Sequence, residues 1–287
     1  MIKNYVNYIT YTRQFSSNTI RNHIRALKQF DNFLIRYDKS ANDPENIRLI
    51  DVYNFIESLG RRGLTPWTAA WMVDAIRSYL KYCKYVMELD TVDPSKVKSP
   101  KVPEKEIWYF SKEEKRSILK LVNAWFWKTE ELQLRNKLLT YLFLHTGLRI
   151  HEMAKIKVNE IWESLQIIGK GGRRRFVYLR SEILDMIYLY LGKRRVPSDY
   201  LFWGYKWEHL TADRICHIFV SMSKACWIHI HAHKFRHTFA TDLLHVPWSN
   251  IYNVAKLLGH KYISTTQVYL GADNWELKKI QFWLSFA

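Results

Sequence analysis

The sequence has few cysteines and no long apolar run, and both absences narrow the class of protein. Its three cysteines, Cys83, Cys216 and Cys226, are scattered, and no two of them form a CxxC pair. Neither a disulfide framework nor a zinc ribbon is supported, so we expect a reducing compartment such as the cytoplasm. No apolar run reaches the roughly 18 residues of a membrane helix, and the N-terminus lacks the apolar core of a signal peptide. We therefore expect no membrane association.

The sequence also has fewer acidic than basic residues. The chain of 287 residues carries 44 Lys and Arg against 27 Asp and Glu, a formal net charge of +17. An excess of this size is typical of proteins with a polyanionic partner. The hydrophobic fraction of 48% is ample for packed cores and argues against disorder. We expect a globular, nucleoid-associated protein that works near nucleic acid in the cytoplasm.

Residues 1–92 predict a compact helical domain with basic edges, because apolar residues recur at helical spacing with Lys and Arg on the other faces. Thr65 followed by Pro66 has the pattern of an N-cap with proline at the first helical position. Arg61 and Arg62, just before it, form a basic turn that we expect to contact DNA.

Residues 93–106 contain three prolines and few large apolar side chains, which predicts an extended, exposed linker. A path along DNA and a plain spacer remain alternatives. Residues 107–287 predict a larger helical domain in which Leu165–Ile168 and Phe176–Leu179 form two short strands. The whole chain is thus expected to be mainly α with a small β-hairpin, an α+β fold. Its amphipathic end, about residues 274–287, is expected to dock on the same chain or on a neighbour.

Local signals predict where helices of the larger domain begin and end. Ser111 and Glu114 form a capping box, and Gly147 ends a Leu-rich helix. Helices are expected at about residues 131–146, from 148, and at 182–191, 211–224, 234–245 and 250–258.

Two arginines suit the binding of a phosphodiester. The planar guanidinium pairs with two phosphate oxygens and stays charged, so it stabilises the charge that develops when the phosphate is attacked. Arg149 and Arg236 are the candidates. Glu152 lies three residues after Arg149 and shares its helix face, so it can orient cationic groups from behind. His233 lies three residues before Arg236.

A glycine-rich basic turn separates the two predicted strands, GKGGRRR at residues 169–175. Its glycines permit close approach of the backbone, so Lys170 can reach a base edge and the leaving 5′ oxygen, to which it can donate a proton. Arg173, Arg174 and Arg175 are expected to contact phosphates only.

Four histidines at residues 229, 231, 233 and 237 raise the alternative of a metal site. No cysteine or carboxylate completes the set nearby, and phosphoryl transfer to a protein nucleophile needs no metal. We expect neither a metal nor a cofactor.

The nucleophile is predicted to be Tyr269, one of 18 tyrosines. It follows the run LLGH by nine residues, with His260 as the histidine of that run. Gly259 ends one helix and the next is capped by Ser or Thr, so Tyr269 is expected on a short helix. Cations and a base, His260 or His233, would activate the phenol. Tyr252 and Tyr262 are the alternatives.

Taken in order, TGLRIHE, GKGGRRRFVYL, HAHKFRHTFAT, LLGH and the spaced tyrosine resemble the motifs of the tyrosine recombinase (phage integrase) superfamily. The N-terminal region resembles, by pattern, the family's helical core-binding domain, which has a SAM-like fold. The resemblance assigns catalytic roles to Arg149, Lys170, His233, Arg236, His260 and the nucleophile Tyr269, with Glu152 as acidic support.

The resemblance implies a site-specific DNA recombinase. The tyrosine attacks a scissile phosphate of a double-stranded recombination site, a 3′-phosphotyrosyl link forms, and two rounds of strand exchange pass through a Holliday junction. The assembly implied is a homo-tetramer on DNA, monomeric or dimeric when free, with accessory proteins possible. Neither ATP nor metal is required.

Three departures from the family pattern leave the subfamily open: His151 in place of Ser, Tyr178 in place of Pro, and Leu270-Gly271 in place of Thr-His. The compact length is similar to Xer-type enzymes or a mobile-element integrase. Two alternatives are a related strand-cleaving enzyme, either a type IB topoisomerase or a telomere resolvase, and a DNA-binding accessory protein without catalysis.

Overall fold

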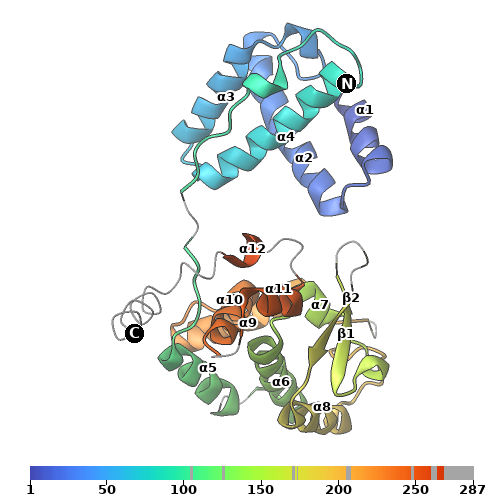
Figure 1. Cartoon of the computed structure of the whole chain (residues 1–287), viewed down its shortest axis with the longest axis vertical. Helices are drawn as coiled ribbons and strands as arrows, with labels where there is room; N and C mark the ends of the chain where they lie inside the picture. Colours follow the sequence, from blue (N-terminus) through green and yellow to red (C-terminus); the bar gives the residue numbers. More distant parts are fainter. Residues whose placement is uncertain are drawn as a thin grey trace, which may run out of the picture. The chain divides into compact units, whose positions relative to one another are not determined.

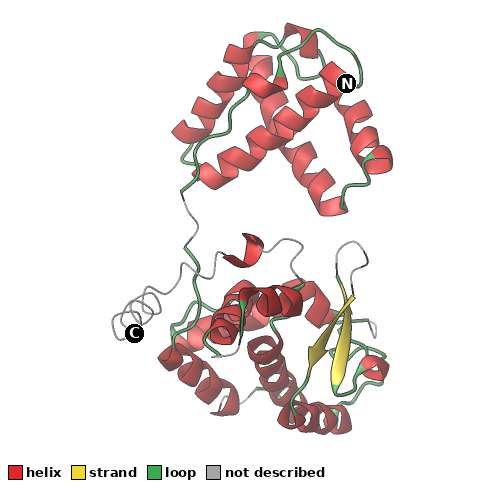
Figure 2. Ribbon diagram, in the orientation of Figure 1, coloured by secondary structure: helices red, strands yellow, loops and turns green. Residues whose placement is uncertain are grey.

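The protein forms two compact units, residues 1–105 and 106–287 (Figure 1). Helices dominate both units, and the described strands form one two-stranded antiparallel sheet in the second unit (Figure 2). This confirms the predicted mainly α fold with a small β-hairpin. The computed structural model describes residues 1–103, 106–124, 127–169, 172, 174–204, 208–246, 249–259 and 264–267.

The N-terminal unit is built from helices α1 (Ile2–Asn7), α2 (Ser17–Leu34), α3 (Leu49–Arg61) and α4 (Pro66–Tyr85). Short π- or 3₁₀-helical turns lie at Tyr8–Thr12, Ile35–Tyr37, Pro44–Asn46 and Pro94–Lys96. Helix α2 is amphipathic: its apolar face is buried against the rest of the unit, with the rings of Phe30 and Phe55 5.2 Å apart. Arg21, Arg25 and Lys28 stay exposed on its other faces.

Helix α4 begins as its sequence predicts. The hydroxyl of Thr65 accepts a hydrogen bond of 3.3 Å from the backbone N–H of Thr68, and Pro66 takes the first helical position. Proline is favoured there because its missing N–H has no partner within the helix in any case. Arg61 and Arg62 lie just before this start, at the end of α3, and both are exposed.

The predicted linker, residues 93–106, is not extended and exposed throughout, which corrects one expectation, and Pro94–Lys96 form a 3₁₀ turn. Val97 is buried in the core of the unit. Arg77 donates 2.8 Å hydrogen bonds from Nε to the carbonyl oxygen of Val97 and from Nη2 to the hydroxyl of Ser99. The buried side chains of Pro94 and Val97, together with the hydrogen bonds from Arg77, therefore hold the first half of this proline-rich segment on the unit.

The C-terminal unit contains the elements that carry most of the candidate site. Its helices are α5 (Lys112–Ala124), α6 (Glu130–Thr146), α7 (Ile150–Ala154), α8 (Ser181–Lys193), α9 (Ala212–Cys226), α10 (Ala232–Leu244), α11 (Ile251–Leu258) and α12 (Ser264–Gln267), with a 3₁₀ turn at Val158–Glu160. The Ser111 and Glu114 capping box is confirmed, because each residue's side chain accepts a hydrogen bond from the other's backbone N–H.

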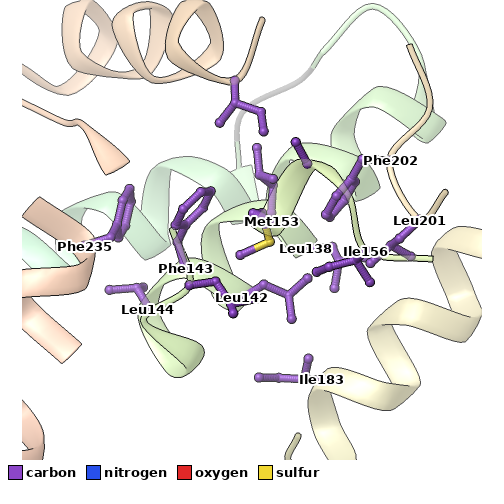
Figure 3. Packing of buried hydrophobic residues seen from close by; sticks show 14 of the residues in the cluster. Leu138, Leu142, Phe143, Leu144, Met153, Ile156, Ile183, Leu201, Phe202 and Phe235 are labelled. Atoms are coloured by element: carbon purple, nitrogen blue, oxygen red, sulfur yellow. The ribbon is translucent and has the colours of Figure 1, made fainter. Parts of the chain in front are cut away.

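Helix α6 runs through the core of this unit, packed by α5, α8 and α10. Figure 3 shows Phe143 of α6 facing Phe235 of α10, and the two rings are stacked with centroids 5.7 Å apart. Phe219 of α9 and Phe110 also pack against Phe235, with ring centroids 5.0 and 4.9 Å away. Because Phe235 is fully buried, the polar residues beside it on α10 are held in place by core packing.

The hairpin pairs β1 (Ser164–Ile168) with β2 (Arg174–Tyr178) in antiparallel register, with Ile167 opposite Arg175. The first strand lies within a residue of its prediction, but the second starts two residues earlier than predicted. The prediction assigned Arg174 and Arg175 to the turn because their side chains are polar. Strand pairing, however, depends on backbone N–H and C=O groups, which these residues also supply. Residues on β2 alternate between exposed and buried, so Arg174 points outward and Arg175 inward.

No helix among the described residues is long and apolar enough to cross a membrane. The predicted docking segment, residues 274–287, lies outside the described residues.

Candidate active site

The described residues include four of the seven residues assigned by the sequence to catalysis or its support: Arg149, Glu152, His233 and Arg236. The other three, Lys170, His260 and Tyr269, lie outside the described residues, and their roles stay predictions. Arg173, expected to contact phosphates, also lies outside them.

Arg149 lies in the short connection between α6 and α7. Gly147 ends α6 in the left-handed conformation, Leu148 is fully buried, and Arg149 is the N-cap residue of α7. A buried leucine thus anchors the chain one residue before the arginine. The side chain of Arg149 keeps 40% of its surface exposed.

Glu152 accepts two hydrogen bonds from Arg149. One carboxylate oxygen accepts a 2.8 Å hydrogen bond from the backbone N–H of Arg149, and the other accepts a 3.0 Å bond from its Nη1. The spacing of three residues therefore gives the contact that the sequence predicts. Glu152 is 10% exposed, so the pair is shielded from water on the side of the carboxylate.

A second arginine completes this arrangement. Arg175 of β2 approaches the same carboxylate with both Nη atoms, at 2.9 and 2.6 Å, and only 8% of its side chain is exposed. Burial raises the pKa of Glu152, but the hydrogen bonds and charges of the two arginines outweigh burial and lower the pKa to about 2. Glu152 is consequently ionised at any pH at which the protein is expected to work.

Arg175 was expected to contact phosphates, but its side chain points inward. Its guanidinium is engaged by Glu152, whereas Arg174 projects from the exposed face of the hairpin. Strand alternation was the signal that could have separated the two, because Arg175, Val177 and Leu179 fall on one buried face.

Arg236 lies deeper than Arg149, with 4% of its surface exposed. It donates from Nη1 to the carbonyl oxygen of Gly147 at 2.6 Å and from Nη2 to that of Leu258 at 2.7 Å. These carbonyls lie at the C-terminal ends of α6 and α11. Arg236 therefore joins the segment that leads into Arg149 to the segment that leads toward His260.

Gly147 fits this junction because a side chain has no room there. A Cβ atom on Gly147 would lie 2.3 Å from Cδ1 of Phe239, and the residue has a φ of +57°. Both the contact and the left-handed backbone favour glycine.

We expect Gly147→Ala to destabilise the C-terminal unit by about 2–5 kcal/mol, from about 1–2 for a left-handed alanine and about 1–3 for overpacking. Urea unfolding measures this. Gly172→Ala is the matched control, since Gly172 has a φ of +73° with no atom within 4 Å of an added Cβ. Equal losses of unfolding free energy in the two variants would show that the close contact between the new Cβ and Phe239 does not destabilise the unit.

His233 is an exposed residue in the first turn of α10. The helix is capped by His231, whose Nδ1 accepts from the backbone N–H of Lys234 at 3.2 Å. The rings of His233 and His237 are 6.3 Å apart, as expected for neighbours one helical turn away. Among the described residues, no group of three His, Cys, Asp or Glu side chains is arranged to hold a metal ion.

An open cleft of about 1760 Å³ lies over Arg149, between α7, the hairpin and α11. Figure 1 shows α7 and α11 next to each other in this unit, with the hairpin beside α7. The charged side chains that line the cleft are mostly basic: Arg149, Lys155, Lys157, Arg174, Arg175 and Lys256, against Glu152 and Glu160. A cleft with this charge suits an anionic ligand larger than a small metabolite.

Arg61 and Arg62 belong to the N-terminal unit. Arg61 forms an exposed ion pair of 2.7 Å with Glu57, and Arg62 donates to the side chain of Gln29 at 3.3 Å. Exposed contacts of this kind are weak, so both arginines can exchange them for phosphates.

Comparison with known proteins agrees with the architecture of both units. Residues 109–275 match the Phage integrase family, and residues 2–85 match the phage integrase N-terminal SAM-like domain. Tyrosine recombinase XerC of Bacillus subtilis is 26% identical over 281 residues, covering 93% of this chain and 90% of the relative. Tyrosine recombinase XerC of Leptospira interrogans is 28% identical over 289 residues, covering 97% and 90%.

Solved structures share the fold at lower identity. The Tn1549 transposon integrase in complex with transposon right end DNA has a TM-score of 0.75 at 14% identity, covering 99% of this chain and 98% of that one. The XerH site-specific recombinase bound to palindromic difH substrate has a TM-score of 0.72 at 23% identity, covering 91% and 78%. Because the match to the catalytic family model alone spans more than half of the sequence, the chain belongs to the phage integrase family.

Proposed function

We propose that this protein is a site-specific tyrosine recombinase that cuts and rejoins DNA through a 3′-phosphotyrosyl intermediate. The observation that carries the proposal is the pair of anchored arginines. Arg149 is held by Glu152 at the basic cleft, and Arg236 ties the segment before Arg149 to the end of α11. The relatives named tyrosine recombinase support the same activity.

In this mechanism the two arginines bind the scissile phosphate and stabilise the extra charge of its transition state. Tyr269 attacks the phosphorus, the new bond joins its phenolic oxygen to the 3′ phosphate, and the bond to the 5′ oxygen breaks. Lys170 donates a proton to that leaving oxygen. His260 or His233 accepts the phenolic proton. The free 5′ hydroxyl of a partner strand then reverses the step and releases the tyrosine.

The net charge of +17 and the two-unit architecture support a clamp around one half of a double-stranded recombination site. The exposed Arg21, Arg25 and Lys28 of α2 and the pair Arg61 and Arg62 are the DNA contacts proposed for the N-terminal unit. We further propose that four protomers act on two sites through a Holliday junction in the cytoplasm, with residues 274–287 docking between protomers.

The direct test is to incubate the purified protein with a nicked duplex that carries the sequence flanking its own gene, and to separate the products on a denaturing gel. A covalent protein–DNA band and recombinant products from paired duplexes are expected. Supercoil relaxation without recombinants would favour a topoisomerase, and stable binding without any covalent band would favour an accessory protein.

DNA binding is expected to weaken steeply with salt, because each phosphate neutralised by Lys or Arg releases counterions. With about 6–10 phosphate contacts, affinity should fall by about 10³–10⁵ between about 50 and 200 mM salt. Arg61→Gln combined with Arg62→Gln should reduce the slope by about two, one for each lost contact. Fluorescence anisotropy measures both quantities. A flat salt response would contradict the DNA clamp.

A further inference from the structure

Glu152 is shared between two arginines that come from different elements. Its carboxylate accepts two hydrogen bonds from Arg149 and two from Arg175. The Arg175 contact is bidentate, which fixes the plane of the carboxylate as well as its distance. The Arg149 contact uses one side-chain N–H and one backbone N–H. The orientation of the Arg149 side chain thus depends on a carboxylate whose plane is set by Arg175.

The charges of this cluster also favour a role for Arg175. Glu152 paired with Arg149 alone would cancel the positive charge that a phosphate needs. With Arg175 bonded to the same carboxylate, the three groups carry a net charge of +1. Arg149 therefore keeps an oriented guanidinium at the cleft, and the cleft keeps its positive charge.

Arg175 also supports the end of α11. The left-handed Gly259 passes so close that an added Cβ would lie 3.0 Å from Cδ and 3.2 Å from Nη1 of Arg175. The preceding residue, Leu258, is held by Arg236 on its carbonyl oxygen. The last residue of α11 thus accepts a hydrogen bond from one buried arginine, and the glycine that follows it, immediately before His260, lies against another.

We propose that Arg175 is a positioning residue of the active site: through Glu152 it orients Arg149, and through Gly259 it fixes the start of the segment that carries His260. This proposal rests on the recombinase function proposed above. In this role Arg175 does not contact the DNA substrate. Its neighbour Arg174, on the opposite face of the same strand, is left for DNA.

The first arm of the test is single-turnover cleavage of the nicked duplex over a range of pH. Arg175→Gln should cleave about 100-fold more slowly, as expected when a reacting group is displaced by about 1 Å. Arg175→Lys should recover little of the rate, because a point charge cannot replace the bidentate fork. Arg180→Gln removes an exposed arginine after the hairpin and is the matched control, with an unchanged rate expected.

The pH profile separates positioning from a loss of folding. Without Arg175, Glu152 should become protonated at a higher pH, so Arg175→Gln should lose activity in mild acid where the wild type does not. Adding Glu152→Gln should remove that acidic limb. A rate reduced equally at every pH, or full rescue by Arg175→Lys, would overturn the positioning role.

The second arm needs no DNA and separates this proposal from the proposed function. Carbon-13 NMR of the Glu side chains follows the titration of Glu152, assigned by the Glu152→Gln variant. The pKa of about 2 should rise toward its ordinary value in Arg175→Gln and stay unchanged in Arg174→Gln. An equal titration in all three proteins would overturn the coupling. If the wild type forms no covalent adduct while the titration shifts, the proposed function fails and the coupling stands.

Discussion

Tyr269→Phe is expected to abolish the covalent protein–DNA band while leaving DNA affinity unchanged. The substitution removes one phenolic oxygen, the atom that forms the bond to phosphorus, and keeps the ring. A free phenol has a pKa of about 10 and is a weak nucleophile at neutral pH. Nearby cations and a base must activate it, so another tyrosine placed outside this arrangement should not replace it.

The control for this experiment is Tyr252→Phe. Tyr252 is an exposed residue of α11, and its loss should leave the band at wild-type intensity. Tyr262→Phe tests the other candidate. The assignment fails if Tyr269→Phe still forms the adduct, and the band that disappears in one of the other variants would then identify the nucleophile. Affinity measured for each variant on the same duplex separates lost chemistry from lost binding.

Local sequence signals predicted local structure well, because each depends on a few neighbouring atoms. Thr65 with Pro66, Ser111 with Glu114, and Gly147 at the end of α6 all have the predicted conformation. The contact of Glu152 with Arg149 belongs to the same class, since it joins the N-cap residue of α7 to the third residue of the same helix. These cases required no knowledge of how distant segments pack.

Long-range contacts escaped prediction for the opposite reason. Arg175 pairs with a residue 23 positions earlier, and Arg236 reaches carbonyls 89 and 22 positions away. A basic residue beside a glycine-rich turn predicts an exposed phosphate contact unless strand alternation is considered as well. The motifs therefore identified Arg236 as a candidate by residue type and order, and its double anchor became visible only in the fold.

The anchored position of Arg236 makes its replacement the second change with a large expected effect. Arg236→Lys should slow single-turnover cleavage by about 10²–10³, as when one preorganised donor to a transition-state charge is lost. Lysine keeps the charge, but it lacks the fork that spans the carbonyl oxygens of Gly147 and Leu258. Arg214→Ala removes an exposed arginine of α9 and should cleave at the wild-type rate.

Because Arg236 is buried, its variants should also lose stability, and the two losses must be measured separately. Arg236→Ala leaves two carbonyls without these donors, at about 1–3 kcal/mol each. The melting temperature should then fall by on the order of 10 °C for a unit of this size. Cleavage well below the melting temperature, with a DNA affinity close to that of wild type, isolates the chemical loss. Near-normal cleavage by folded Arg236→Lys would remove Arg236 from the active site and leave it as the structural link between α6 and α11.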